Sequence, residues 1–266
     1  MKVLNRKNRI LLTELTKTDF KLRYQGSILG YLWAIIRPLL MFGILYIVFA
    51  KFLRFGTDIP HYPVYLLVGT VLWNFFTECT SQGIQSLIIR SDLMRKISFP
   101  RWIIVLSATT TALINLGINL VVVLLFSIFS GVGISLTWLL VPLLIIELYL
   151  LSFGLALFLG SINVKYRDIG SIWEVLIQAL FYAIPIIYPL SMVISYNSFA
   201  ADLLMLNPIA QVIQDVRFCL ITKEAVTGWS ILPGLSKIIP VVFVAVVFLV
   251  GLIVFKKKSK YFAEEI

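Results

Sequence analysis

The chain has 266 residues, of which 60% are hydrophobic and 14% are charged. This balance excludes an ordinary soluble domain, in which about a quarter of the residues are charged. The formal net charge of +10 is compatible with nucleic-acid binding, so the positions of the cations have to decide its meaning. Cys79, Cys219 and the single histidine, His61, match no metal-ligand spacing and no disulfide framework.

Residues 8–24 form a basic segment with a helical stripe of Leu11, Leu15, Thr18 and Leu22. The pattern is typical of an amphipathic helix that lies in the membrane interface. A merely basic cytoplasmic tail is the alternative.

A turn at Gln25, Gly26 and Ser27 leads into the apolar run 31–49, whose only charge is Arg37. About 20 mostly apolar residues cross a bilayer, so this run begins the first expected span. Because a charge inside a span is costly, Arg37 either faces protein or water or extends to the headgroups. No small-residue cleavage pattern follows a short apolar core, so we expect no cleavable signal peptide.

Apolar length and charge predict an all-α membrane protein with six transmembrane helices. The expected spans are 31–52, 62–89, 102–130, 136–162, 170–190 and 233–255. Residues 191–232 contain only shorter apolar runs, and Asn207 with Pro208 has the pattern of a helix N-terminus. We interpret this segment as two short external re-entrant helices, over 192–206 and 209–220. An amphipathic external loop is the alternative.

The Lys and Arg residues are distributed unequally between the two sides of these spans. Seven precede the first span, four lie in the second loop, two in the fourth loop and four after the last span, whereas five lie on the opposite side. The positive-inside rule therefore places both termini in the cytoplasm. The basic charge indicates topology, and no nucleic-acid partner is expected.

The acidic residues within the expected spans, Glu78, Glu147 and Glu174, come from different helices. A metal-dependent membrane enzyme needs clustered ligands, so we interpret Glu78 and Glu147 as helix contacts and Glu174 as an interfacial residue. A proton-coupled carrier is the alternative. The chain has no phosphate-binding loop and no dinucleotide fingerprint. We therefore expect no enzyme activity and no cofactor in this chain, and any energy from ATP must come from a partner.

The second loop is the best candidate for docking a cytoplasmic partner. Ser91 or Asp92 can cap a short helix there, and Pro100 precedes the third span. Exposed apolar residues on a cytoplasmic loop fit a partner's groove, although they can also rest on the bilayer. The expected contact residues are Asp92, Leu93, Met94, Arg95, Lys96, Ile97, Phe99 and Pro100.

Aromatic side chains recur at helical spacing in two spans. They are Phe42, Tyr46 and Phe49 in the first span and Trp173, Phe181, Tyr182 and Tyr188 in the fifth. Aromatic faces stack on sugar rings, which suits passage of a sugar polymer. Ordinary helix packing and interface belts are the alternative.

Several segments, taken in order, resemble one family. They are RYQGSILGYLWAIIRP, YPVYLLVGTVLWNFF, LMRKISFPRW, NVKYRDI, LNPIAQVIQDVR and the terminal YFAEEI. These segments resemble the type-2 ABC exporter permeases that move lipid-linked polysaccharides such as O-antigen or teichoic acid. The resemblance covers almost the whole chain.

The resemblance implies a homodimer in the bacterial cytoplasmic (inner) membrane, with two copies of a cytoplasmic ATPase that binds ATP and Mg²⁺. Residues 1–30 would form the amphipathic helix and elbow, and residues 31–266 the six-helix domain, with a coupling helix at about 91–100. The substrate would be an undecaprenyl-linked glycan, surrounded by membrane lipid. Residues expected where the substrate enters are Arg23, Tyr24 and Arg37, since Arg suits phosphate oxygens. Residues expected to line the channel are Trp33, Phe42, Tyr46, Phe49, Trp173, Phe181 and Tyr182.

Two other functions stay open at this point. A drug or small-lipid exporter would have the same fold. A membrane enzyme of lipid-linked sugar metabolism is disfavoured because clustered acids are absent from the sequence.

Overall fold

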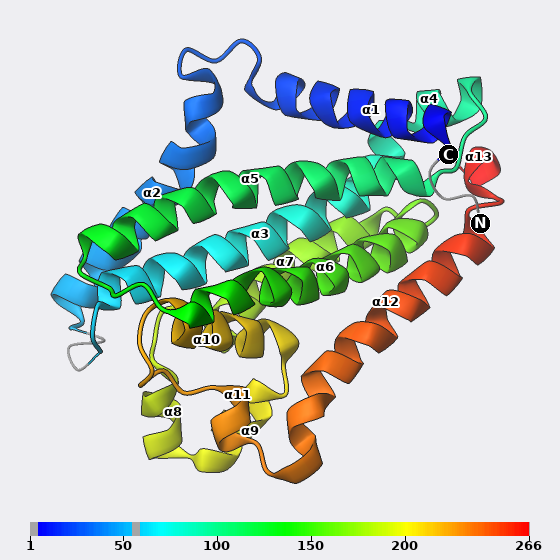
Figure 1. Ribbon diagram of the computed structural model, residues 1–266. Coiled ribbons are helices and arrows are strands. Elements are labelled where there is room, and N and C mark those ends of the chain that lie inside the picture. The colour runs from blue at the N-terminus through cyan, green and yellow to red at the C-terminus, as the bar shows by residue number, and fades with distance from the viewer. Residues whose placement is uncertain (1–4, 55–58, 266) are drawn as a thin grey trace.

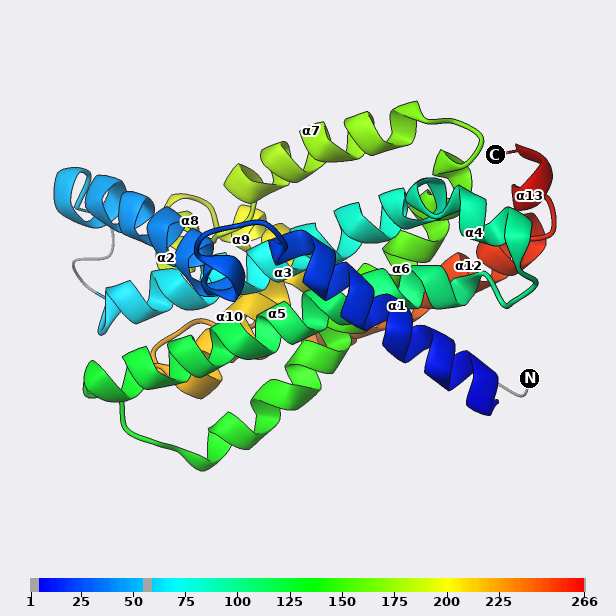
Figure 2. The same ribbon diagram turned by 90° about the horizontal axis from the view of Figure 1, so that it is seen from above.

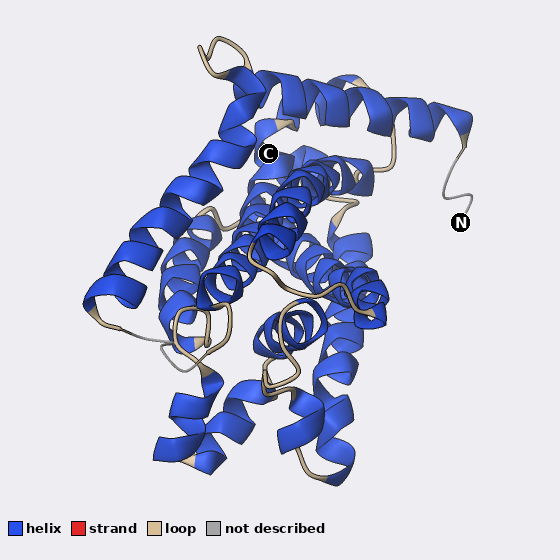
Figure 3. Ribbon diagram, turned by 60° about the vertical axis from the view of Figure 1, so that its left-hand side comes forward, coloured by secondary structure: helices blue, strands red, loops and turns tan. Residues whose placement is uncertain are grey.

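The computed structural model describes residues 5–54 and 59–265, and these form helices and connecting turns without a strand (Figure 3). The helices that lie largely within the expected spans are α2 (Trp33–Leu45), α3 (Tyr62–Ile89), α5 (Trp102–Phe129), α6 (Val141–Asn163), α7 (Asp168–Ala183) and α12 (Ile239–Lys258). The other helices are α1 (Arg6–Tyr24), α4 (Ser91–Lys96), α8 (Leu190–Tyr196), α9 (Ser198–Met205), α10 (Pro208–Leu220), α11 (Gly228–Ile231) and α13 (Phe262–Glu265). Helices α3, α5 and α6 run side by side, with α12 inclined to them (Figure 1). The all-α prediction is confirmed.

Four stretches of the described residues are long and apolar enough to cross a membrane. They are Gly30–Phe52, Trp102–Phe129, Leu136–Asn163 and Gly234–Lys258, which coincide with the first, third, fourth and sixth expected spans. Helix α3 has the required length but carries several polar residues, and most of its side chains are buried by neighbouring helices. Six spans therefore remain a prediction.

The expected fifth span, 170–190, is wrong at its end, because α7 stops at Ala183. Pro185 disfavours helical backbone in the residue before it. The carbonyl groups of Pro185 and Ile186 then accept hydrogen bonds from Arg217 instead of continuing the helix.

Close packing between helices depends on small residues. A Cβ atom added to Gly251 of α12 would collide with the backbone of Gly154 on α6. The two glycines thus allow α6 and α12 to approach each other closely, as small residues do between helices in membranes.

Helix α1 crosses over α5 (Figure 2). Its buried face includes Leu15 and Thr16, whereas Thr18 and Leu22 of the expected stripe are exposed. Phe20, which lies off that stripe, stacks on Tyr31 with 5.3 Å between ring centroids. The expected stripe is therefore only partly correct, because packing on the bundle selects the face of α1 that turns inward.

The segment after α7 folds into four short helices, α8 to α11, instead of the two expected. The predicted N-terminus of α10 is confirmed: Asn207 Oδ1 accepts a hydrogen bond from the Ile209 amide at 2.9 Å, and Pro208 is the first helical residue. Almost every side chain of α10 is buried, and α10 packs against α6 and α3. It is a core element rather than an exposed loop.

The buried side chain of Arg217 on α10 connects α10 to its neighbours in the bundle. Its side chain is 0% exposed, and its guanidinium donates to the carbonyls of Tyr65, Pro185 and Ile186 at 3.0, 2.7 and 2.5 Å. It also donates to Gln214 Oε1 at 3.0 Å and lies 3.5 Å from the centroid of the Tyr65 ring. One cation thus joins α3, the turn after α7, and α10.

The basic segments share one end of the bundle. The start of α1, helix α4, the end of α12 and the turn between α6 and α7 lie together there (Figure 1). The unequal distribution of cations along the sequence therefore corresponds to one physical end of the molecule.

Candidate functional site: a polar network between α1 and the bundle

Helix α5 carries a buried polar stripe within an otherwise apolar segment. Ser107, Thr111, Asn115 and Asn119 follow one another at intervals of four residues, and all four are buried. This spacing places them on one face of a helix. The stripe faces α1, α3 and the beginning of α2 through the contacts described below.

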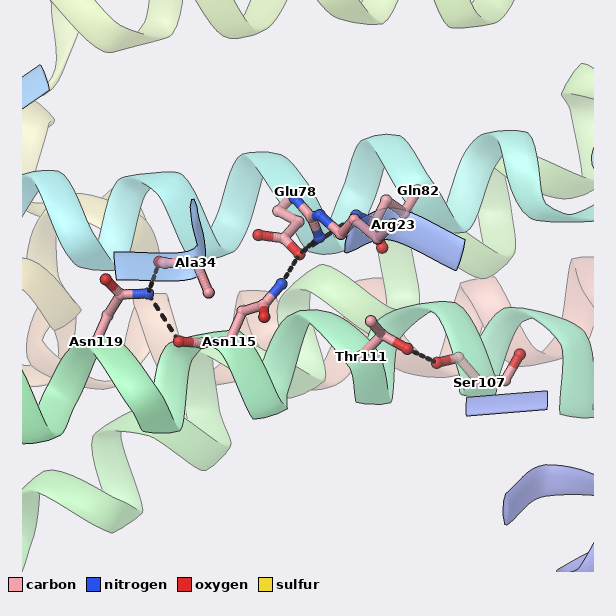
Figure 4. A network of polar contacts seen from close by, with 8 residues as sticks. All are labelled: Arg23, Ala34, Glu78, Gln82, Ser107, Thr111, Asn115 and Asn119. Carbon is pink, nitrogen blue, oxygen red and sulfur yellow. Dashed lines mark hydrogen bonds and ion pairs between the residues drawn. The ribbon is translucent and has the colours of Figure 1, made fainter. Parts of the chain in front are cut away.

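Glu78 of α3 is the centre of the network (Figure 4). Its carboxylate accepts hydrogen bonds from Asn115 Nδ2 at 2.6 Å and Gln82 Nε2 at 3.2 Å. It also forms an ion pair with Arg23 near the end of α1. A carboxylate among apolar helices needs such partners, because an unpaired buried charge costs several kcal/mol. The expectation that Glu78 makes a helix contact is confirmed.

A second ion pair connects α1 to the basic end of the bundle. Asp19 on α1 pairs with Arg90, the residue between α3 and α4. Ser107 Oγ also donates to Asp19 Oδ2 at 3.4 Å. Because α4 begins at Ser91, the residue directly before α4 is the one that pairs with α1.

The outer part of the stripe contacts α2. Asn119 Nδ2 donates to the Ala34 carbonyl at 3.2 Å and to the Asn115 carbonyl at 2.8 Å. The network therefore runs from α4 through α1 and α3 to the start of α2. Buried networks of this kind hold their members in one arrangement and are sensitive to the loss of any member.

The expected partner-docking residues form α4 and the extended link to α5. Asp92, Arg95, Lys96, Ile97 and Pro100 are exposed, Leu93 and Phe99 are half-buried, and Met94 is buried. The expected cap by Ser91 or Asp92 is wrong, since the N-cap residue is Arg90, whose side chain makes no capping hydrogen bond to α4. Arg90 is instead engaged by Asp19.

The C-terminal helix α13 packs against α4. Phe262 is 0% exposed and belongs to the same buried apolar cluster as Met94. Its ring meets that of Phe255 edge to face, with 5.4 Å between centroids.

Replacing Phe262 with Ala is expected to loosen α4. Truncating a buried Phe costs about 3–5 kcal/mol of folding stability. Part of this lost stability should appear as local opening of α4. Limited trypsin digestion of the purified protein should then cleave after Arg95 and Lys96 at least about tenfold faster. Tyr261→Ala is the control because Tyr261 is exposed, and equal cleavage rates in both variants would contradict this role.

The residues expected where the substrate enters lie in different environments. Arg23 is paired with Glu78, whereas Arg37 is exposed on α2. The side chain of Tyr24 lies outside what the structure describes.

The aromatic residues expected to line a channel are shared between the spanning stretch Gly30–Phe52, which contains α2, and helix α7. Trp33 and Tyr182 are exposed, whereas Phe42, Tyr46, Phe49 and Phe181 are half-buried and Trp173 is buried. Trp173 Nε1 donates to Thr80 Oγ1 of α3 at 3.0 Å, and the Phe181 ring lies 5.9 Å from that of Trp73. Phe42 meets Phe126 of α5 edge to face.

The α5 stripe was absent from the sequence predictions. Its signal was available, because four Ser, Thr and Asn residues at intervals of four stand within a 28-residue apolar helix. Polar side chains inside a membrane helix tend to face protein and to carry function. Their partners on α1 and α3 could not be identified without the fold.

A helical bundle with four stretches of spanning length and a polar network inside it defines an integral membrane protein. The chain matches the ABC-2 type transporter family over residues 11–220 and belongs to that family. The resemblance to type-2 ABC exporter permeases is thereby confirmed.

Curated relatives cover most of the chain. The O-antigen export system permease protein RfbA of Myxococcus xanthus is 31% identical over 259 residues, 96% of this chain and 95% of that protein. The protein of the same description from Klebsiella pneumoniae is 31% identical over 202 residues, 73% of this chain and 77% of its own. The polysialic acid transport protein KpsM of Escherichia coli is 24% identical over 252 residues, 91% of each chain.

Proposed function

We propose that this chain is the membrane permease subunit of an ATP-driven exporter that moves an undecaprenyl-linked polysaccharide across the bacterial cytoplasmic membrane. The observation that carries the proposal is the similarity to an O-antigen export permease over 95% of both chains. ATP and Mg²⁺ would bind to a partner ATPase, since this sequence has no phosphate-binding loop.

The proposed assembly is a homodimer with two ATPase subunits, six spans per chain and both termini in the cytoplasm. Two open surfaces support it. Helices α2 and α7 leave several large apolar side chains uncovered, including Leu40, Ile44, Val175 and Tyr182, and a second copy would cover them around a shared path. At the basic end, Arg95, Lys96 and Ile97 of the second loop are exposed and available to a cytoplasmic partner.

The proposed transmission starts at α4. Closure of the ATPase pair would move α4, and Arg90 would carry that movement to Asp19 and α1. Arg23 would then pull on Glu78, and the start of α2 would shift through Asn119. Arg37 and Tyr24 would meet the lipid pyrophosphate, and Arg23 would join them when released from Glu78. The aromatic residues of the stretch Gly30–Phe52 and of α7 would contact the sugar units.

Complementation tests the proposed function. Cells that lack their own O-antigen export permease accumulate lipid-linked glycan inside. Expression of this chain with its ATPase should restore glycan at the surface, whereas a catalytically inactive ATPase should not. Failure of every glycan tested, together with ATP-dependent export of a drug or small lipid, would overturn the glycan assignment.

Reversing the charges of Arg95 and Lys96 to Glu is expected to weaken ATPase binding about tenfold or more, because like charges across an interface cost free energy. Co-purification of tagged ATPase measures the effect. Arg6→Glu with Lys7→Glu is the matched control, since both residues are exposed at the same end. Unchanged co-purification of the Arg95 and Lys96 variant would show that the ATPase docks elsewhere.

A further inference from the structure

A cavity of about 210 Å³ lies between the start of α3, the start of α8, helix α10 and the loop after α10. These elements lie at the end of the bundle away from α4 and the other basic segments (Figure 1). Ile59, Pro189, Leu190 and Val226 form an apolar wall. Sites for drug-sized ligands have volumes of about 300–1,000 Å³, so this cavity suits a smaller molecule.

Gln214 of α10 presents a fixed amide donor to this cavity. The residue lines the cavity and is 1% exposed. Its Oε1 accepts hydrogen bonds from Tyr65 Oη at 3.1 Å and from Arg217 Nη1 at 3.0 Å. Because a guanidinium only donates, the accepting atom is the oxygen. Gln214 Nε2 donates to no described residue, yet it is not among the enclosed atoms that lack a partner, so it faces the open cavity.

Three further polar residues line the cavity. Ser191 and Glu224 are exposed, and Thr222 is half-buried. Thr222 Oγ1 accepts from the Glu224 amide at 3.2 Å, so its hydroxyl proton stays available to donate. Glu224 forms no ion pair with another described residue. The cavity therefore combines one carboxylate acceptor with amide and hydroxyl donors.

This combination of groups selects among small ligands. No Lys, Arg or His is among the described residues that line the cavity, so a phosphate or carboxylate ligand would face Glu224 without a compensating cation. An ammonium ion only donates hydrogen bonds and would leave the Gln214 amide unpaired. A sugar hydroxyl both donates and accepts, so neighbouring hydroxyls of one ring can satisfy Glu224 and Gln214 together.

We propose that this cavity binds one neutral sugar unit, with Gln214 Nε2 donating to one hydroxyl and the Glu224 carboxylate accepting from another. The inference rests on the proposed function, because it gives the exported glycan a contact beyond the aromatic residues of α7. Pro189 of the cavity wall follows Tyr182 of α7 by seven residues, so at most about 25 Å separates the two. Arg217, which holds the Gln214 amide in place, makes the donor ready before the sugar arrives.

Sugar binding to the purified permease without its ATPase tests the site. The probes are D-glucose, D-galactose, D-mannose, L-rhamnose and N-acetyl-D-glucosamine, and saturation-transfer NMR measures their binding. At least one should bind with a Kd of about 1–10 mM. Ser191→Trp should abolish binding by filling the cavity, whereas Ser195→Trp should keep it, since Ser195 is exposed on the same helix outside the lining. Glu224→Gln should weaken binding about tenfold.

Three results would overturn the sugar site. The first is a wild-type protein that binds none of the five sugars. The second is binding that persists unchanged in both Ser191→Trp and Glu224→Gln, which would place the sugar elsewhere. The third is tighter binding of cationic D-glucosamine than of every neutral sugar, which would assign the cavity to an amine. Both variants change exposed residues, so an unchanged Tm should accompany them.

Export assays keep this inference separate from the proposed function. Restored glycan export by a chain that binds none of the sugars would remove the sugar site and leave the exporter assignment standing. Sugar binding that is lost in Ser191→Trp would support the site even where complementation fails, because the binding assay needs neither the ATPase nor a complete glycan.

Discussion

Replacing Arg217 with Met is expected to lower the Tm of the purified permease by about 10 °C. The substitution keeps an unbranched apolar side chain but removes the guanidinium groups that donate to the Tyr65, Pro185 and Ile186 carbonyls. Breaking a buried charged network in this way costs about 3–5 kcal/mol, and each kcal/mol shifts the Tm by about 2–4 °C in a chain of 150–250 residues. Much of the protein should aggregate in size-exclusion chromatography.

Arg217→Met should lower the stability of the protein more than the removal of a comparable exposed cation does. Lys223→Met, six residues further along the chain, removes one exposed hydrogen bond to Thr137 and should change stability by less than about 1 kcal/mol. Arg217→Lys keeps the charge but loses the planar fork that reaches several acceptors, and it should fall between the two. A Tm for Arg217→Met within 2 °C of the wild type would show that Arg217 does not hold the outer helices together.

Glu78→Gln is expected to reduce ATP-dependent glycan export about tenfold or more while leaving ATPase binding intact. The substitution removes the charge that pairs with Arg23 but preserves the size of the side chain. Without this pair, the end of α1 is no longer tied to the middle of α3, so movement of α4 should no longer reach the bundle. Arg23→Met should have a similar effect.

A double-mutant cycle measures the interaction between Arg23 and Glu78 separately from the contribution of each residue alone. Residues in one buried network show coupling energies of about 0.5–3 kcal/mol, so the double variant should be less impaired than the sum of the single variants. The matched control is the Glu14–Lys17 pair, also on α1, whose side chains are 63% and 68% exposed. An exposed pair of this kind should show a coupling below about 0.5 kcal/mol. Additive effects at Arg23 and Glu78 would show that the two residues act independently.

The sequence by itself determined the features that depend on local chemistry. Apolar run lengths predicted an all-α fold and the position of four stretches that can cross a membrane. The side chain of Asn207 and the fixed φ angle of Pro208 determined where α10 begins. The cations of the second loop and of both terminal segments indicated one basic end, because charge position along a chain of known spans maps directly onto its ends.

Only the tertiary structure decided which distant residues meet. Arg217 and the Tyr65 carbonyl are 152 residues apart, and Arg23 and Glu78 are 55 apart, so no local pattern pairs them. The turn that follows α7 is held by Arg217, which donates to the carbonyls of Pro185 and Ile186. Hydropathy reports the free energy of transferring each side chain from water to an apolar environment. The partner of a buried polar group depends instead on how the helices pack, and packing is a property of the whole chain.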